Sequence, residues 1–260
     1  MNNVQLAGSD TAAAKFLTDT LPSMQHLVDV NLREYSAIPN SGAAGGLIAL
    51  KPEALTLTMA ADVRVYFVGE GAGYHNTLGF NTLGFNTGAA GVLGSNPLLI
   101  FPDASSPNSY LSSGSTKRTL SEPLMPGDFV NLGKMAAGTN LDFFLISNGA
   151  NGGNNVFSTD SKLNADKINH VVSFAQVNNP YVLFSFEDMY GGGDRDYNDA
   201  IFAVYFGERN VQTLLRSASL HSLPAPEPGF LWLLVAVCGG AMLYSRRRAS
   251  RLPMLALAGQ

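Results

Sequence analysis

An acidic, glycine-rich segment between positions 187 and 199 carries the side chains of this chain that are best suited to chemistry. Its oxygen-bearing residues are Glu187, Asp188, Asp194, Asp196, Asn198 and Asp199, and its three consecutive glycines are Gly191, Gly192 and Gly193. Carboxylate and amide oxygens are the ligands that Ca²⁺ takes in proteins. Without a cation, so many neighbouring carboxylates would repel one another. The segment therefore predicts a Ca²⁺ site.

The spacing of the later acidic residues favours one shared ion. Asp194, Asp196 and Asn198 occupy alternate positions. Alternate side chains of an extended or tightly turned segment lie on the same side, so the oxygens of these three residues would gather. Glu187 or Asp188, across the glycine turn, would complete a shell of about six to eight oxygens.

The last residues of the segment do not match the EF-hand, a known calcium-binding loop. The spacing that starts at Asp194 matches the opening of an EF-hand, but the sixth position would be Asp199 rather than Gly and the twelfth Tyr205 rather than Glu. The segment is therefore not an EF-hand. Asp199 is expected either to reach the same ion or to fix the loop backbone. The alternative for the whole segment is an acidic loop held by Asx-type hydrogen bonds to its own backbone.

Catalysis is the weaker interpretation of these carboxylates. Paired carboxylates can hydrolyse glycosides when they are held about 5–9 Å apart in a sugar cleft. No sequence feature indicates that cleft, and the one tryptophan, Trp232, falls in a C-terminal apolar run. We therefore predict no enzymatic activity. A carbohydrate-binding or carbohydrate-cleaving module remains the alternative, with Tyr74, Phe80 and Phe85 as its exposed aromatic residues.

A zinc site is disfavoured because it needs clustered His or Cys. His75 and His170 are the only histidines of the predicted β domain, and the single cysteine, Cys238, lies in the C-terminal run. His75 is predicted to hydrogen-bond within its glycine-rich loop. Three further acidic residues are predicted to be turn or surface residues: Asp103, Asp142 and Asp160.

Composition and patterning predict a mainly β protein, an antiparallel, jelly-roll-like β-sandwich with a short N-terminal helical segment and a C-terminal transmembrane helix. Charged residues make up only 14% of the 260 residues and glycines number 27, a profile typical of many short strands joined by polar turns. Apolar and alternating runs predict strands at 55–59, 62–68, 98–101, 128–132, 141–147, 170–176, 181–187 and 200–206. The net charge of −4, without a basic patch on the folded part, argues against nucleic acid as a partner.

Changes in composition predict the domain organisation. The expected regions are an N-terminal helical segment (1–35), the β-sandwich domain (50–207), a polar linker (208–225), a C-terminal signal with a transmembrane helix (226–251) and a tail (252–260). Within the first region, residues 11–34 show helical spacing, Asp10 is placed to cap the helix, and Pro22 divides it into two.

The C-terminal region has three parts in a fixed order. Pro226, Glu227 and Pro228 precede an apolar run at 230–244, and Arg246, Arg247 and Arg248 follow it. Basic residues on one side only predict a membrane helix with its C-terminal end in the cytoplasm. The order resembles the PEP-CTERM sorting signal of Gram-negative bacteria. That resemblance implies cleavage near Pro-Glu-Pro by an exosortase, and delivery to the cell surface or an exopolysaccharide matrix. An unprocessed tail-anchored membrane protein is the alternative.

The body of the chain also resembles a known family. The stretch Gly191–Asp199 reads Gly-Gly-Gly-Asp-Arg-Asp-Tyr-Asn-Asp, and segments 67–76 and 141–145 accompany it. Together they resemble a domain-of-unknown-function family (number 4114) over about residues 55–206. The resemblance implies a secreted β-rich domain without an established activity. Residues 1–10 lack the basic and apolar regions of a secretory signal, with which proteins that carry such a sorting signal normally begin. The expected location is the inner membrane before processing and the cell surface or extracellular space after it.

Overall fold

The computed structural model describes residues 4–32, 46–81, 97–104 and 124–222. The chain divides into two compact units, Met1–Ala218 and Ser219–Gln260, and the strands that the structure describes lie in the first. The predicted C-terminal signal at 226–251 and the tail at 252–260 lie outside the described residues. Among the described residues, no helix has the length and apolar character needed to cross a membrane.

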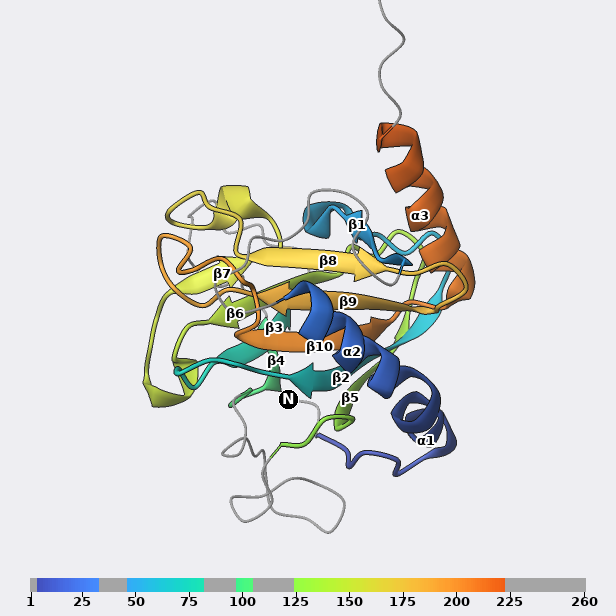
Figure 1. Ribbon diagram of the computed structural model, residues 1–260, viewed down its shortest axis with the longest axis horizontal. Helices are drawn as coiled ribbons and strands as arrows, with labels where there is room; N and C mark the ends of the chain where they lie inside the picture. The colour runs from blue at the N-terminus through green and yellow to red at the C-terminus, as the bar shows by residue number, and fades with distance from the viewer. Residues whose placement is uncertain (1–3, 33–45, 82–96, 105–123, 223–260) are drawn as a thin grey trace, which may run out of the picture. The chain divides into compact units, whose positions relative to one another are not determined.

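Two antiparallel sheets form the body of the first unit (Figure 1), which confirms the prediction of a mainly β protein. The larger sheet has the order β1-β8-β9-β10-β2-β5 and the smaller one β4-β3-β6-β7. The strands are β1 (Ile48–Leu50), β2 (Ala61–Gly69), β3 (Thr77–Asn81), β4 (Pro97–Phe101), β5 (Phe129–Met135), β6 (Asp142–Ile146), β7 (Val156–Ser158), β8 (Val171–Ala175), β9 (Tyr181–Phe186) and β10 (Ala200–Tyr205).

One hydrophobic core joins the two sheets. Val65 and Phe67 of β2 face it together with Phe143 of β6 and Phe184 of β9. The ring of Phe143 lies 5.0 Å from that of Phe184 and 5.2 Å from that of Phe202, measured between ring centroids. Because side chains alternate along a strand, the other side of the larger sheet needs a cover of its own.

The N-terminal helical segment provides that cover. It consists of α1 (Thr11–Lys15), a π-helical turn (Phe16–Thr20) and α2 (Leu21–Asn31), and α2 lies in front of the larger sheet in Figure 1. Phe16 stacks on Tyr66 of β2 with ring centroids 4.0 Å apart. The side chain of Asp10 accepts a hydrogen bond of 2.8 Å from the backbone N–H of Ala13, which confirms the predicted cap.

Residues 55–59 do not form the predicted strand. Thr56 makes only an isolated bridge to Asn140. The side chain of Asn210 explains why the ladder stops there, since its Oδ1 accepts hydrogen bonds from the backbone N–H groups of Thr58 and Met59. Three of the strands were not predicted: β1 and β7, which have only three residues each and so show no clear alternation, and β3.

The region predicted as a polar linker (208–225) contains the helix α3 (Glu208–Ser222). Its residues Val211 and Leu215 are buried against the core between the sheets. The helix also holds Asn210, whose Nδ2 donates to the carbonyl of Phe206 at 2.8 Å and to that of Met59 at 3.0 Å. At least the first part of α3 therefore belongs to the packed domain.

Candidate metal centre

The acidic segment is the connection between β9 and β10, which are neighbours inside the larger sheet. Phe186 pairs with Ala200 at the ends of these strands, so Glu187 and Asp199 follow on opposite sides of the connection. The backbone N–H of Asp199 donates to the carbonyl of Phe186 at 3.1 Å, and the N–H of Asp188 donates to Oδ2 of Asp199 at 2.8 Å. Residues eleven positions apart in sequence are thus brought together by the pairing of their strands.

Five of the six predicted metal ligands form two overlapping groups. Glu187, Asp194 and Asp196 each offer a carboxylate oxygen, and these oxygens lie within 4.8 Å of one another. The same holds for Glu187, Asp188 and Asp199. Each group could hold a metal ion, and the carboxylate of Glu187 belongs to both.

Three of these five carboxylates are removed from water, whereas Asp199 is half-buried and Asp194 is exposed. Glu187 is 1% exposed, Asp188 3% and Asp196 1%. Burial raises the pKa of Glu187 and of Asp188 above the usual carboxyl range. Burial, and next the neighbouring charge of Asp188, raise the pKa of Asp199 to about 8. A bound cation would lower these pKa values again, because it favours the ionised carboxylates.

Three ion pairs of the described residues lie away from Glu187, Asp188 and Asp199. They join Arg64 to Asp10, His75 to Asp103 and His170 to Asp166. Among these pairs none reaches Glu187, Asp188 or Asp199. Side-chain cations of the described residues therefore do not neutralise this part of the cluster by direct contact.

The glycine turn allows the backbone to close over Glu187. Gly193 has a φ of +42°, and a Cβ atom at this position would overlap the Glu187 carboxylate. On the other side of that carboxylate, Oε2 accepts a hydrogen bond of 3.1 Å from the backbone N–H of Arg195. Gly191 and Gly192 also have positive φ angles, so the three predicted turn glycines all adopt left-handed conformations.

Asn198, the sixth predicted ligand, contacts Asp196 rather than lying apart from the cluster. Its Nδ2 donates to Oδ2 of Asp196 at 2.7 Å, and its backbone N–H donates to Oδ1 of Asp196 at 3.1 Å. The second bond is of the Asx type that the alternative interpretation predicted. The loop therefore combines hydrogen bonds to its own backbone with a convergence of carboxylates.

A neighbouring loop supplies a residue that the sequence reasoning missed. Asn76, fully buried between β2 and β3, donates from Nδ2 to Oδ2 of Asp188 at 2.7 Å. Its Oδ1 accepts from the backbone N–H of Asn148 at 3.0 Å. The adjacent His75 lies with Nδ1 3.1 Å from Oδ2 of Asp103, so its ring contacts a residue that follows β4 and not one of its own glycine-rich loop.

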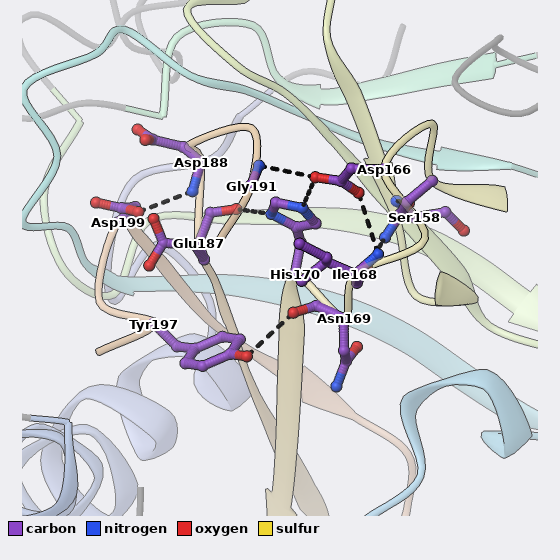
Figure 2. A network of polar contacts seen from close by, with 11 residues as sticks. Ser158, Asp166, Ile168, Asn169, His170, Glu187, Asp188, Gly191, Tyr197 and Asp199 are labelled. Atoms are coloured by element: carbon purple, nitrogen blue, oxygen red, sulfur yellow. Dashed lines mark hydrogen bonds and ion pairs between the residues drawn. The ribbon is translucent and has the colours of Figure 1, made fainter. Parts of the chain in front are cut away.

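Asp166 and His170 were also missed as site residues, although their i, i+4 spacing directly before β8 was a signal. Figure 2 shows His170 between Asp166 and the acidic loop. Its Nδ1 lies 3.1 Å from the carbonyl oxygen of Glu187, and its Nε2 lies 2.8 Å from Oδ2 of Asp166. Burial alone would raise the pKa of Asp166, but hydrogen bonds from Gly191, His170 and Ile168 bring it below the usual value.

The aromatic residues of the carbohydrate alternative are only partly accessible. Phe80 was predicted to be exposed, but it is 1% exposed because β3 turns it into the core between the sheets. Phe85 lies outside the described residues. Tyr74 is 43% exposed, and Tyr190, at the tip of the acidic loop, is 58% exposed. Of the three acidic residues predicted for turns or the surface, Asp103 and Asp142 are instead buried, and Asp142 accepts a hydrogen bond from Thr159.

One protein family matches this part of the chain. The model of the family described as Domain of unknown function (DUF4114) matches residues 135–207, which include the whole acidic loop and the strands β6 to β10. No curated protein and no solved structure matches the chain.

Proposed function

We propose that this chain is an exported bacterial surface protein whose jelly-roll-like β-sandwich binds Ca²⁺ through the loop between β9 and β10. The role is structural or adhesive, not enzymatic. The observation that carries the proposal is the sharing of Glu187 by two groups of three carboxylates, each with oxygens within 4.8 Å. So dense a set of oxygen donors, three of them buried, suits a hard divalent cation.

The donor set favours Ca²⁺ over other common ions. Zinc sites are built on His or Cys, and both ring nitrogens of His170, the histidine next to this loop, already contact oxygen acceptors. Mg²⁺ demands near-ideal octahedral geometry and keeps several waters. Ca²⁺ accepts six to eight oxygens in a flexible arrangement, and an irregular loop provides these more readily.

The ion would stabilise the folded domain. It binds the assembled carboxylates of the folded state and not the dispersed ones of the unfolded chain. The loop connects β9 to β10, and Asn76 ties Asp188 to the connection before β3, so the ion would fasten both sheets at one end. Outside a cell, where Ca²⁺ is abundant, such a site would keep the domain folded.

Thermal unfolding with Ca²⁺, with Mg²⁺ and with a chelator tests the metal site. A saturating ion at about 100 times its Kd adds about 2.7 kcal/mol, which raises the midpoint by several degrees. Asp160→Asn is the matched control, since Asp160 accepts a hydrogen bond from Lys162 in an exposed turn. A midpoint that is the same in Ca²⁺ and in chelator would sink the proposal.

The C-terminal region supports the proposed route to the surface by its resemblance to a sorting signal. Exosortase would recognise Pro226, Glu227 and Pro228, while residues 230–244 hold the chain in the inner membrane and Arg246–Arg248 stay in the cytoplasm. The mass of the mature protein from its host tests this. A product that ends near Pro228 is expected, and one that retains Gln260 would favour the unprocessed, tail-anchored form.

A carbohydrate-binding surface is the second candidate function, with exopolysaccharide as the partner. It is favoured by Tyr74 and Tyr190, two exposed rings on connections that the Asn76–Asp188 hydrogen bond joins. Polysaccharide pull-down with the parent domain, Tyr74→Ala and Tyr190→Ala tests it. Retention of the parent and loss of both variants are expected, whereas a parent domain that is not retained would exclude this function.

A further inference from the structure

We propose that Asp166 and His170 act as positioning residues that hold the acidic loop ready for its ion; we call this pair the Asp166–His170 brace. The inference rests on the proposed function, because it concerns the same metal centre. Neither side chain is among the carboxylates grouped around Glu187. The brace acts through the backbone of the loop and not as a ligand.

His170 fixes the start of the loop. Its side chain is fully buried, and its ring stacks on Phe157 with centroids 3.7 Å apart and planes 13° apart. The ring in this position places Nδ1 3.1 Å from the carbonyl oxygen of Glu187. The backbone of the two residues adds a second link, since the N–H of Glu187 donates to the carbonyl of His170 at 2.9 Å. Glu187, the residue that both carboxylate groups share, is thus held at its main chain from both directions.

Asp166 fixes the glycine turn. Its Oδ2 accepts from the backbone N–H of Gly191 at 2.9 Å and contacts Nε2 of His170 at 2.8 Å. Its Oδ1 accepts from the backbone N–H of Ile168 at 3.1 Å. One carboxylate therefore connects the turn of the loop, the ring that holds Glu187 and its own chain segment (Figure 2).

The segment that carries the brace is also attached to the smaller sheet, outside the acidic loop. Asn164 is fully buried, its Oδ1 accepts from the backbone N–H of Ser158 at 2.7 Å, and its Nδ2 donates to the carbonyl of Ile168 at 2.7 Å. These bonds attach the connection between β7 and β8 to the end of β7. The brace is thus anchored on the sheet and not on the residues that would bind the ion.

Pre-positioning matters here because the carboxylates repel one another. A loop free to move would spread its charges apart in the absence of a cation, and ion binding would then have to include the cost of reassembling them. A loop held at Glu187 and at Gly191 cannot open in this way. Groups that hold metal ligands by hydrogen bonds typically change metal affinity by about 10- to 100-fold when they are removed.

The test compares the full chain with its Asp166→Asn, His170→Gln and Asp160→Asn variants by two measurements. The first is the Kd for Ca²⁺ from calorimetry; we expect it to weaken by about 10-fold or more in the first two variants and to stay unchanged in Asp160→Asn. The second is hydrogen exchange of residues 187–195 in chelator. We expect faster exchange in the first two variants even when no ion is present.

Two further variants separate positioning from general stability. Phe157→Leu keeps both hydrogen bonds of His170 and removes the stacking. It should lower the unfolding midpoint while the Kd stays within a few-fold of the parent. Asp166→Glu retains a carboxylate and should recover part of the affinity lost in Asp166→Asn. If circular dichroism shows that Asp166→Asn does not fold, Asp166→Glu and His170→Gln are judged by the same two measurements.

The outcomes separate this inference from the proposed function. If the parent binds Ca²⁺ and the brace variants keep its Kd and its exchange rates, the brace is overturned and the calcium site stands. A midpoint lowered equally with and without Ca²⁺, at an unchanged Kd, would assign the two residues to stability alone and also overturn the brace. A parent that binds no Ca²⁺ would refute the proposed function, and the positioning role with it.

Discussion

Asn76 donates a hydrogen bond of 2.7 Å to Asp188, a residue 112 positions later in the chain, and both side chains are buried. The bond joins the connection between β2 and β3 to the acidic loop between β9 and β10. It also stabilises the charge of a buried carboxylate, since a hydrogen bond to the ionised form favours that form.

Asn76→Ala should therefore destabilise the domain by about 1–3 kcal/mol, because it leaves Asp188 buried without this donor. Chemical unfolding in chelator measures the change. Asn151→Ala is the control, since Asn151 is exposed and donates only to the nearby Asn148. Equal losses in the two variants would contradict the role given to the buried bond.

Carboxylate-to-amide substitutions should show that the two carboxylate groups of the acidic loop share Glu187. Glu187→Gln removes a charge from both groups, whereas Asp194→Asn and Asp199→Asn each remove one from a single group. We expect the Kd for Ca²⁺ to weaken most in Glu187→Gln, by roughly 100-fold or more on the scale of lost ligand interactions, and less in the other two. Calorimetry at constant pH makes the comparison. An affinity of Glu187→Gln equal to that of the parent would exclude Glu187 as a shared ligand.

Without Ca²⁺, stability should fall as the pH rises from about 4 to about 8. Asp199 has a folded-state pKa of about 8 against an ordinary value of 3.8, and the pKa values of Glu187 and Asp188 are also raised. In this window the folded protein holds protons that the unfolded chain has lost, so a rising pH favours unfolding. The pKa of Asp166 is lowered, so this residue makes stability rise with pH. It does so only at pH values below the ordinary carboxyl pKa range.

Saturating Ca²⁺ should remove most of this decline, because the ion favours the ionised carboxylates at every pH in the window. Urea unfolding at pH 5, 6, 7 and 8, with Ca²⁺ and with chelator, makes the comparison. Asp199→Asn should flatten the decline in chelator, since it removes the group with the highest pKa. A free energy of unfolding that rises from pH 5 to pH 8 in chelator would count against these assignments.

Gly193→Ala should cost more than Gly191→Ala, although both residues have positive φ angles. A Cβ atom at 191 meets no atom within 4 Å, whereas one at 193 overlaps the Glu187 carboxylate. We expect a loss of about 1 kcal/mol for Gly191→Ala from backbone strain alone. For Gly193→Ala we expect a larger loss, together with impaired Ca²⁺ binding. Chemical unfolding of both variants measures these losses. Similar free energies of unfolding for Gly193→Ala and Gly191→Ala would show that the loop adjusts around Glu187.

Local patterns were sufficient to predict several elements. The cap by Asp10 depends on residues three positions apart, and the alternation in 62–68 predicted β2 because its inward side chains lie on every second residue. The acidic loop was also visible locally, as a dense run of oxygen donors between two apolar strands. Its glycines predicted the turn, because left-handed backbone conformations favour them.

Other features depend on segments that are distant in the sequence. The failure of residues 55–59 to form a strand follows from Asn210, about 150 positions later, which takes the backbone N–H groups of Thr58 and Met59. The burial of Phe80 follows from the packing of β3 inside the smaller sheet. No local pattern contains such information, because it depends on which strands become neighbours.

The sequence by itself thus determined the β character of the domain, the position of the loop and the chemical nature of its side chains. The tertiary structure decided which groups hold that loop, namely Asn76 from one connection and Asp166 and His170 from another. The physical reason is that hydrogen bonds and buried charges act over a few ångströms of space, whatever the separation along the chain. Strand order brings these residues to one end of the sheets, and only there do their charges and hydrogen bonds act on one another.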